Sequence, residues 1–228
     1  MKFTYYGHAA GLVEANEQRV VIDPFLQGNP LSPVFPNDVL CDFIVLTHGQ
    51  ADHFGDTVEI AKANDATVIA TVELAEYCAS KGLKAHGMNL GGEAVFPFGT
   101  VKLVQAFHSS SFTEEDGRTL YLGMPAGVLI KSDRSTLYHA GDTALFGDMK
   151  LIGDLNSIDV ALLPIGDNYT MGVGDAIEAV GMLRPRIAVP IHYNTFPVIE
   201  ADPQRFARRC SEIGVEASVL EPGRTLEF

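Results

Sequence analysis

The sequence predicts an α/β protein in which two β-sheets pack face to face and helices cover their outer sides. Three observations lead to this prediction: residues 3–22 form short β-rich runs without a helix, strands and helices alternate from Phe43 onward, and the second half of the chain repeats that order. Each sheet has an apolar face to bury, and two such faces bury each other when the sheets stack.

The first half divides into elements at its clusters of turn-forming residues. Residues 23–38 are rich in Pro, Gly and Asn, which predicts an ordered surface loop. Around this loop, the hydrophobic periodicity predicts strands over 3–6, 11–15, 20–22, 43–47 and 67–70, helices over 57–64 and 72–81, and further strands through 104–107.

The second half shows the same alternation and no linker or low-complexity tract. It predicts strands over 128–131, 136–139, 159–163 and 187–191, helices over 144–155, 175–183 and 203–213, and a terminal strand near 217–220. We therefore expect a single domain over residues 1–228, made of two pseudo-repeated halves at about 1–105 and 106–228.

Composition narrows the classes of protein that this chain can belong to. Hydrophobic residues make up 46% of it, but no apolar run is long enough to cross a bilayer, so we expect a core and no membrane insertion. The N-terminus lacks a secretion signal, which predicts a cytoplasmic location. The three cysteines are far apart, which argues against disulfides or a thiolate metal site, and a formal net charge of -13 argues against a nucleic-acid partner.

The strongest chemical signal is the segment 47–56, which directly follows an apolar strand. It holds His48, Asp52 and His53 in a strand-to-helix loop. Imidazole and carboxylate groups are the ligands that zinc and similar divalent metals prefer, and a loop at a strand end can aim several of them at one point. The segment therefore predicts a metal site.

Three more candidate ligands lie far along the chain. His108, Asp142 and His192 each follow a β-rich run. Functional groups gather at strand ends in α/β sheets, so these side chains can converge with the 47–56 loop. The alternative is that they are unrelated residues in turns.

Six motifs resemble the metallo-β-lactamase superfamily, in particular a branch of short prokaryotic metal-dependent hydrolases. They are G-H-A at 7–9, I-D-P-F at 22–25, T-H-G-Q-A-D-H-F-G-D at 47–56, H-A-G-D-T at 139–143, L-P-I-G at 163–166 and P-I-H-Y at 190–193. The resemblance implies a four-layer αββα sandwich with a dinuclear site at its edge. It also implies the ligands: His48, residue 50 and His108 for the first ion, Asp52, His53 and His192 for the second, and Asp142 bridging both.

One position departs from the superfamily pattern H-x-H-x-D-H, because Gln50 stands where the second histidine belongs. A carboxamide is a neutral, weak oxygen donor, so the first site is expected to be weakened, to stay empty, or to prefer a harder ion such as Mn²⁺. We therefore expect one or two divalent ions, Zn or Mn. His8, in the turn after the first strand, is a candidate replacement ligand or proton donor, or else an ordinary turn histidine.

Four further residues are candidates for supporting roles. Asp23 closes a strand and is expected to hydrogen-bond a ligand histidine and fix its tautomer, unless it is a plain turn aspartate. His139 is expected to pack or to support Asp142 rather than to bind metal. Tyr193 and Asn194 follow His192 and are candidate substrate contacts, or part of a polar turn.

These residues predict a metal-dependent hydrolase. A cation lowers the pKa of a bound water, so hydroxide near Asp52 and Asp142 can attack a small ester, lactone or phosphodiester while His8 or a water protonates the leaving group. The alternative is a module without turnover that senses a metal or ligand through a degraded first site. A small molecule is the expected partner, and the sequence leaves homo-oligomerisation open.

Overall fold

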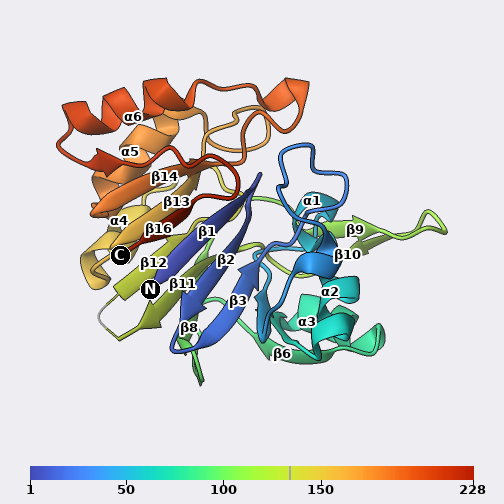
Figure 1. The fold of residues 1–228 in the computed structure, drawn as a ribbon. Coiled ribbons are helices and arrows are strands. Elements are labelled where there is room, and N and C mark those ends of the chain that lie inside the picture. The colour runs from blue at the N-terminus through green and yellow to red at the C-terminus, as the bar shows by residue number, and fades with distance from the viewer. Residues whose placement is uncertain (134) are drawn as a thin grey trace.

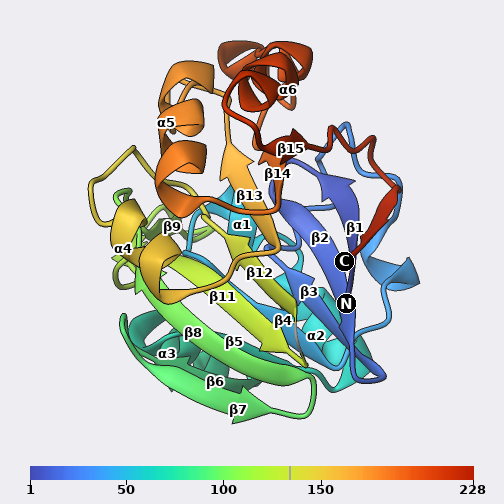
Figure 2. The same ribbon diagram turned by 90° about the vertical axis from the view of Figure 1, so that its left-hand side faces the viewer.

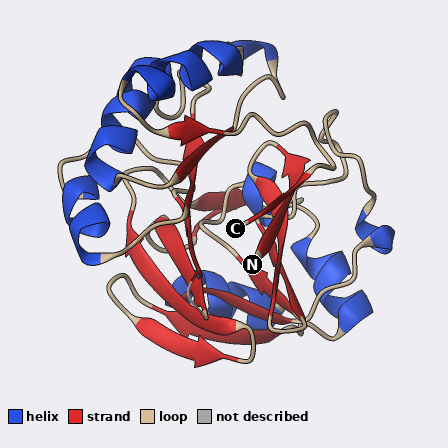
Figure 3. Ribbon diagram, turned by 60° about the vertical axis from the view of Figure 1, so that its left-hand side comes forward, coloured by secondary structure: helices blue, strands red, loops and turns tan. Residues whose placement is uncertain are grey.

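The computed structural model describes residues 1–133 and 135–228. Two seven-stranded mixed sheets pack face to face, and helices cover the outer side of each sheet (Figures 1 and 3). This confirms the predicted α/β class with its four layers.

The first sheet is built mostly from the first half of the chain, and three helices cover it. Its strands in spatial order are β16 (Thr225–Glu227), β1 (Lys2–Gly7), β2 (Ala10–Ala15), β3 (Gln18–Ile22), β4 (Phe43–Val45), β5 (Thr67–Thr71) and β6 (Lys84–Met88). The helices on this side are α1 (Ala51–Phe54), α2 (Thr57–Asn64) and α3 (Val72–Ser80). The short 3₁₀ helix η1 (Pro36–Asp38) lies in the loop between β3 and β4.

The second sheet carries three more helices on its outer face (Figure 2). Its strands in spatial order are β15 (Glu216–Ala217), β14 (Ile187–Ile191), β13 (Val160–Pro164), β12 (Ser135–His139), β11 (Ala126–Ser132), β8 (Gly99–Gln105) and β7 (Glu93–Phe96). The covering helices are α4 (Met149–Leu155), α5 (Val173–Leu183) and α6 (Pro203–Glu212), and η2 (Pro197–Ile199) lies in the loop before α6. A separate hairpin, β9 (Ser111–Thr113) and β10 (Thr119–Tyr121), projects from the body (Figure 1).

Three apolar clusters hold the four layers together. The middle cluster lies between the sheets, and the other two lie between each sheet and its helices. Strand β11 shows how the sequence builds this arrangement: Val128 and Ile130 belong to the middle cluster, whereas Leu129 faces the helices. Neighbouring residues of a strand point to opposite faces, so a continuous apolar run is what a strand buried on both sides requires. Each such side chain contributes about 1.5–3 kcal/mol when fully buried.

The strands that lead into the predicted site residues end at one common edge. Strands β1 and β3 are both antiparallel to β2, and β4 is parallel to β3, so these three strands run in the same direction. Strands β8 and β12 are both antiparallel to β11, and β13 and β14 run parallel to β12. Two backbone hydrogen bonds join the edges of the two sheets: His192 N donates to His8 O at 2.7 Å, and Ala126 N donates to Thr47 O at 2.9 Å.

The structure differs from the sequence predictions at five places. Sheet membership changes between Met88 and Glu93 rather than at residue 105, and the short strand β16 returns to pair with β1 in the first sheet. The last predicted strand, 217–220, shrinks to β15, which ends at residue 217. The predicted helix 144–155 begins only at Met149, because Ala144 N instead donates to Phe107 O. The hairpin β9–β10 was not predicted.

Candidate metal centre

The six predicted ligands converge at the common edge of the two sheets. Three groups form, in each of which one ligand atom per residue lies within 4.8 Å of the others. The first group contains His48, His108 and Asp142, the second contains His8, Asp52, His53 and His192, and the third contains Asp23, His48 and His53. Apart from His8, the first two groups match the two ligand sets that the resemblance implies.

Asp142 connects the two groups. Its Oδ1 lies 3.2 Å from His53 Nε2, and its Oδ2 lies 3.1 Å from His192 Nε2 and 3.5 Å from His108 Nε2. Burial alone would raise the pKa of the Asp142 carboxyl, but the imidazoles of His192 and His53 hold it well below its usual range. Asp142 is therefore a buried carboxylate with imidazoles of both groups around it.

Several of these buried atoms lack the hydrogen bonds that burial normally demands. Among the described residues, His53 Nε2, Asp142 Oδ1 and both ring nitrogens of His192 have no hydrogen-bond partner. The imidazole nitrogens and the Asp142 oxygen that lie close together are therefore not hydrogen-bonded to one another. They point into a shared space. Unpaired buried polar atoms need an explanation, and imidazole nitrogens with carboxylate oxygens form a donor set suited to a divalent cation. The residues fit a metal.

Asp23 controls the tautomers of two candidate ligands. It accepts hydrogen bonds from His53 Nδ1 at 2.7 Å, from Thr47 N at 2.8 Å and from the Thr47 hydroxyl. Since the only hydroxyl proton of Thr47 goes to Asp23, its oxygen accepts from His48 Nδ1 at 3.0 Å. Both imidazoles then carry their proton on Nδ1 and turn the lone pair of Nε2 toward the site. Asp23 therefore has the supporting role expected from the sequence, and it acts on histidines of both groups.

Gln50 presents its oxygen to the first group. Its Oε1 lies 3.1 Å from His108 Nε2 and 3.4 Å from His48 Nε2, while its Nε2 donates to Ser109 Oγ at 2.8 Å. Because the amide NH₂ of Gln50 donates to Ser109, the amide oxygen points toward the first group. Because His48 Nε2 is an acceptor in the tautomer fixed by Asp23, it and Gln50 Oε1 are two acceptors facing each other. A bound cation would satisfy both.

The loops that carry these groups are held by close backbone packing. Gly49 N donates to Ser110 Oγ at 3.0 Å, and a Cβ at Gly49 would lie 2.7 Å from Leu122 Cδ1. Glycine at position 49 therefore lets the loop of His48 lie close against Leu122.

Three residues of the site, each directly after a strand, adopt the left-handed backbone region, which is uncommon for residues other than glycine. They are His8, with φ 57°, Asp23, with φ 44°, and His192, with φ 54°. Such conformations each cost about 1–3 kcal/mol and cluster at functional sites, where the surrounding structure enforces them.

His8, a member of the second group, is fully buried. Its Nε2 lies 3.2 Å from Asp52 Oδ2, and its Nδ1 lies 2.9 Å from Thr195 Oγ1. Burial and the neighbouring His192 lower its pKa to about 4, so the ring is neutral at pH 7. His8 lies behind Asp52 and is not one of the residues that line the pocket over the site.

His139 does not join either group. Its Nε2 donates to Ala9 O at 2.9 Å, and its Nδ1 accepts from Gly141 N at 3.0 Å. Both ring nitrogens are therefore used within the protein, and the ring links strand β12 to the turn between β1 and β2.

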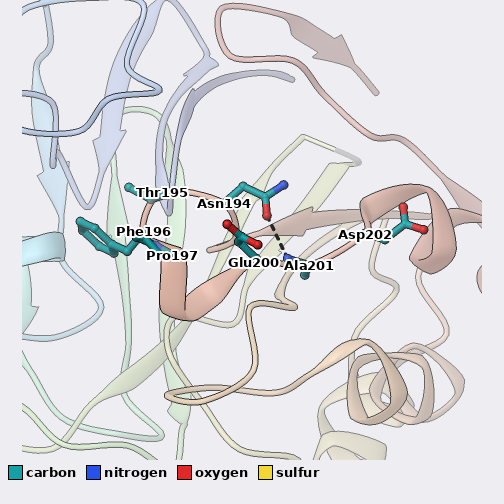
Figure 4. A pocket seen from close by; sticks show the side chains of 7 residues that line it. All are labelled: Asn194, Thr195, Phe196, Pro197, Glu200, Ala201 and Asp202. Carbon is teal, nitrogen blue, oxygen red and sulfur yellow. Dashed lines mark hydrogen bonds between the residues drawn. The ribbon is translucent and has the colours of Figure 1, made fainter.

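The two candidate substrate contacts lie away from the ligands. Tyr193 is buried in the apolar cluster under the helices of the second sheet. Asn194 lies in a neighbouring hollow, where its Oδ1 accepts from Ala201 N at 2.9 Å (Figure 4). Neither residue faces the predicted metal ligands.

A pocket of about 500 Å³ opens directly over the ligands. Its lining residues are Gln50, Asp52, His108, Ser109, Asp142, Tyr169, His192 and Phe196. Tyr169, Phe196 and the connecting role of Thr47 were not predicted from the sequence. Tyr169 lies in the loop after β13 and Phe196 in the loop after β14, and no local pattern in the sequence marks either of them as a pocket residue.

Comparisons with known proteins agree with this geometry. A family model described as the beta-lactamase superfamily domain matches residues 18–193. The chain is 54% identical over its full length to a UPF0173 metal-dependent hydrolase of Anoxybacillus flavithermus, and 54% identical to the UPF0173 metal-dependent hydrolase YtkL of Bacillus subtilis, with each relative covered completely. The solved structure of Igni18, a metallo hydrolase from Ignicoccus hospitalis, superimposes with a TM-score of 0.90 at 40% identity, covering 100% of this chain and 98% of that one.

A membrane crossing would need a helix longer and more apolar than any in the described part of the chain. The family match covers more than half of the sequence, and the relatives align from end to end. The chain therefore belongs to the beta-lactamase superfamily, within its UPF0173 group of metal-dependent hydrolases.

Proposed function

We propose that this hydrolase cleaves a small ester, lactone or phosphodiester at the pocket over the two ligand groups, with one or two Zn or Mn ions. The observation that supports the proposal is that buried ligand atoms without hydrogen-bond partners lie beneath an open pocket of substrate size. The first ion would be held by Gln50, His48 and His108, the second by Asp52, His53 and His192, and Asp142 would contact both. When bound, the cations supply a Lewis acid for the scissile oxygen and lower the pKa of the attacking water.

The remaining task of the protein is to orient the reactants and to move a proton. The Asp52 side chain lines the pocket and is 29% exposed, so its carboxylate can accept a proton from the attacking water. His8 lies behind Asp52 and is held by Thr195, so we assign it as a positioning residue rather than the proton donor of the leaving group. Tyr169 and Phe196 replace Tyr193 and Asn194 as the proposed substrate contacts, because they line the pocket.

Chelation should remove the activity and lower the stability together. We expect protein stripped of metal to lose more than about 100-fold in kcat/KM against ester and phosphodiester substrates, and Zn²⁺ or Mn²⁺ to restore it. Since a metal that binds only the folded state stabilises it, thermal unfolding should shift to higher temperature by several degrees on reloading. Full turnover after verified metal removal would refute the proposal.

Gln50 should make the two metal positions unequal. We expect Zn²⁺ to bind the first position more weakly than the second, and Gln50→His to raise the affinity of the weaker position by about tenfold or more, because imidazole is the better zinc ligand. Calorimetric titration with Zn²⁺ and elemental analysis measure affinity and stoichiometry. Gln50→Ala is the matched control and should weaken the first position further. Unchanged stoichiometry and affinity in Gln50→His would show that residue 50 is not a ligand.

A further inference from the structure

We propose that the substrate of this site is uncharged around its scissile bond, an ester or lactone with an apolar group, rather than a phosphodiester or another anion. This inference rests on the proposed function and narrows its substrate class. It follows from the charges and the aromatic side chains around the pocket.

The pocket wall offers no lysine or arginine to an anionic substrate. Among the described residues that line it, the ionisable groups are two aspartates, two histidines and the phenol of Tyr169. Enzymes that act on phosphoryl groups commonly place arginine or lysine against the charged oxygens. A neutral ester presents a single carbonyl oxygen, and it does not need such a clamp.

The surroundings of the pocket are acidic. Phe196 separates it from a neighbouring hollow whose lining includes Glu200 and Asp202 (Figure 4). The whole chain carries a formal net charge of -13. A field of this sign repels anions as they approach, and an uncharged molecule is not affected.

The metal ions do not reverse this balance. Three carboxylates, Asp23, Asp52 and Asp142, lie in the site or directly against its ligands. With two bound divalent cations the net charge of the site would be +1. With a single divalent cation it would be −1. The ion charge must be included in any such comparison, and here it leaves little excess to attract an anion.

The apolar part of the substrate has a place to bind. Tyr169 is 57% exposed and Phe196 is partly buried, and both line the pocket from loops on the side of His192. Aromatic faces that remain exposed beside a polar centre favour ligands with an apolar or ring-shaped group.

Two esters that differ by one methyl group test the charge preference. Methyl p-nitrophenyl adipate is neutral, whereas mono-p-nitrophenyl adipate has the same scissile bond and a free carboxylate. We expect kcat/KM to be higher by about tenfold for the neutral ester at low salt, with a smaller ratio as ionic strength rises. The matched pair diethyl p-nitrophenyl phosphate and ethyl p-nitrophenyl phosphate extends the comparison to phosphoryl substrates.

A charge introduced into the pocket should reverse the preference. Tyr169→Arg is expected to shift the kcat/KM ratio toward the anionic ester by at least about fivefold. Tyr121→Arg is the matched control: Tyr121 is 68% exposed on the projecting hairpin and lines neither hollow, so its ratio should stay at the wild-type value.

Two outcomes would overturn the inference. One is a wild-type preference for the anionic ester, and the other is an equal shift in both arginine variants.

Because turnover itself depends on the proposed function, binding of non-hydrolysable ketone analogues of the two adipates is measured by calorimetry on metal-loaded protein. Tighter binding of the neutral analogue supports the inference, and tighter binding of the charged one refutes it. Absence of turnover with every substrate and metal would count against the proposed ester or phosphodiester activity and leave the result of this binding comparison standing.

Discussion

Asp142→Ala should abolish metal-dependent hydrolysis and empty both metal positions. The Asp142 carboxylate approaches Nε2 atoms of both ligand groups: His53 at 3.2 Å and His192 at 3.1 Å in the second group, and His108 at 3.5 Å in the first. Removing a residue that merely supports a ligand already lowers metal affinity by about 10–100-fold, so loss of the shared carboxylate should exceed about 100-fold in affinity and in kcat/KM. Calorimetric titration, elemental analysis and steady-state kinetics measure these losses.

The stability of this variant separates loss of metal from loss of fold. Wild-type protein should unfold at a lower temperature after chelation, whereas Asp142→Ala should unfold at the same temperature with and without chelator, because it has no bound ion to lose. Asp148→Ala is the matched control, since Asp148 is exposed before helix α4 and its side chain makes no cap hydrogen bond. A variant that keeps two tightly bound ions would show that Asp142 is not shared between them.

The fold and the convergence of the candidate ligands could be predicted because their signals are local and periodic. Strands such as β11 and β13 are buried on both faces and appear as unbroken apolar runs, and helix α2 was predicted with its observed boundaries. The loop with His48, Asp52 and His53 carries its ligands within six residues, so its chemistry is visible without any tertiary information. The convergence of the distant candidate ligands could be predicted because the strands before them, β8, β12 and β14, run in the same direction.

What could not be predicted depends on pairings across the whole chain. Strand β16 has only three residues, two of them exposed, so its pairing with β1 leaves no periodic pattern in the sequence. Tyr193 follows a ligand residue, and neighbouring residues near a strand end point to opposite sides, which places it in the apolar cluster instead of the site. Tyr169 reaches the pocket through a tight turn in which Asp167 N donates to Met171 O, a contact that composition does not reveal.

Asp23→Asn should weaken both metal positions although Asp23 is not a predicted ligand. The amide keeps the shape of the carboxylate but replaces one acceptor oxygen by a donor, which would face His53 Nδ1–H and the Thr47 hydroxyl. The histidines then favour the tautomer with the proton on Nε2, where the lone pair for the metal is needed. We expect metal affinity to fall by about 10–100-fold, the range found when a partner of a ligand histidine is lost.

The same substitution should also reduce stability without metal, and this distinguishes it from the removal of a ligand. Asp23 is fully buried and accepts three hydrogen bonds, and burial would raise the pKa of its carboxyl were it not for His53, which lowers it below the usual value. Loss of hydrogen bonds to a buried charged group costs about 1.5–3 kcal/mol, so urea unfolding of the chelated protein should reveal a decrease of that size. Asp175→Asn is the matched control, at an exposed position in the first turn of α5. It should change neither the free energy of metal binding nor the free energy of unfolding by more than about 0.5 kcal/mol. If Asp23→Asn weakened only the position that contains His53, the connection through Thr47 to His48 would be wrong.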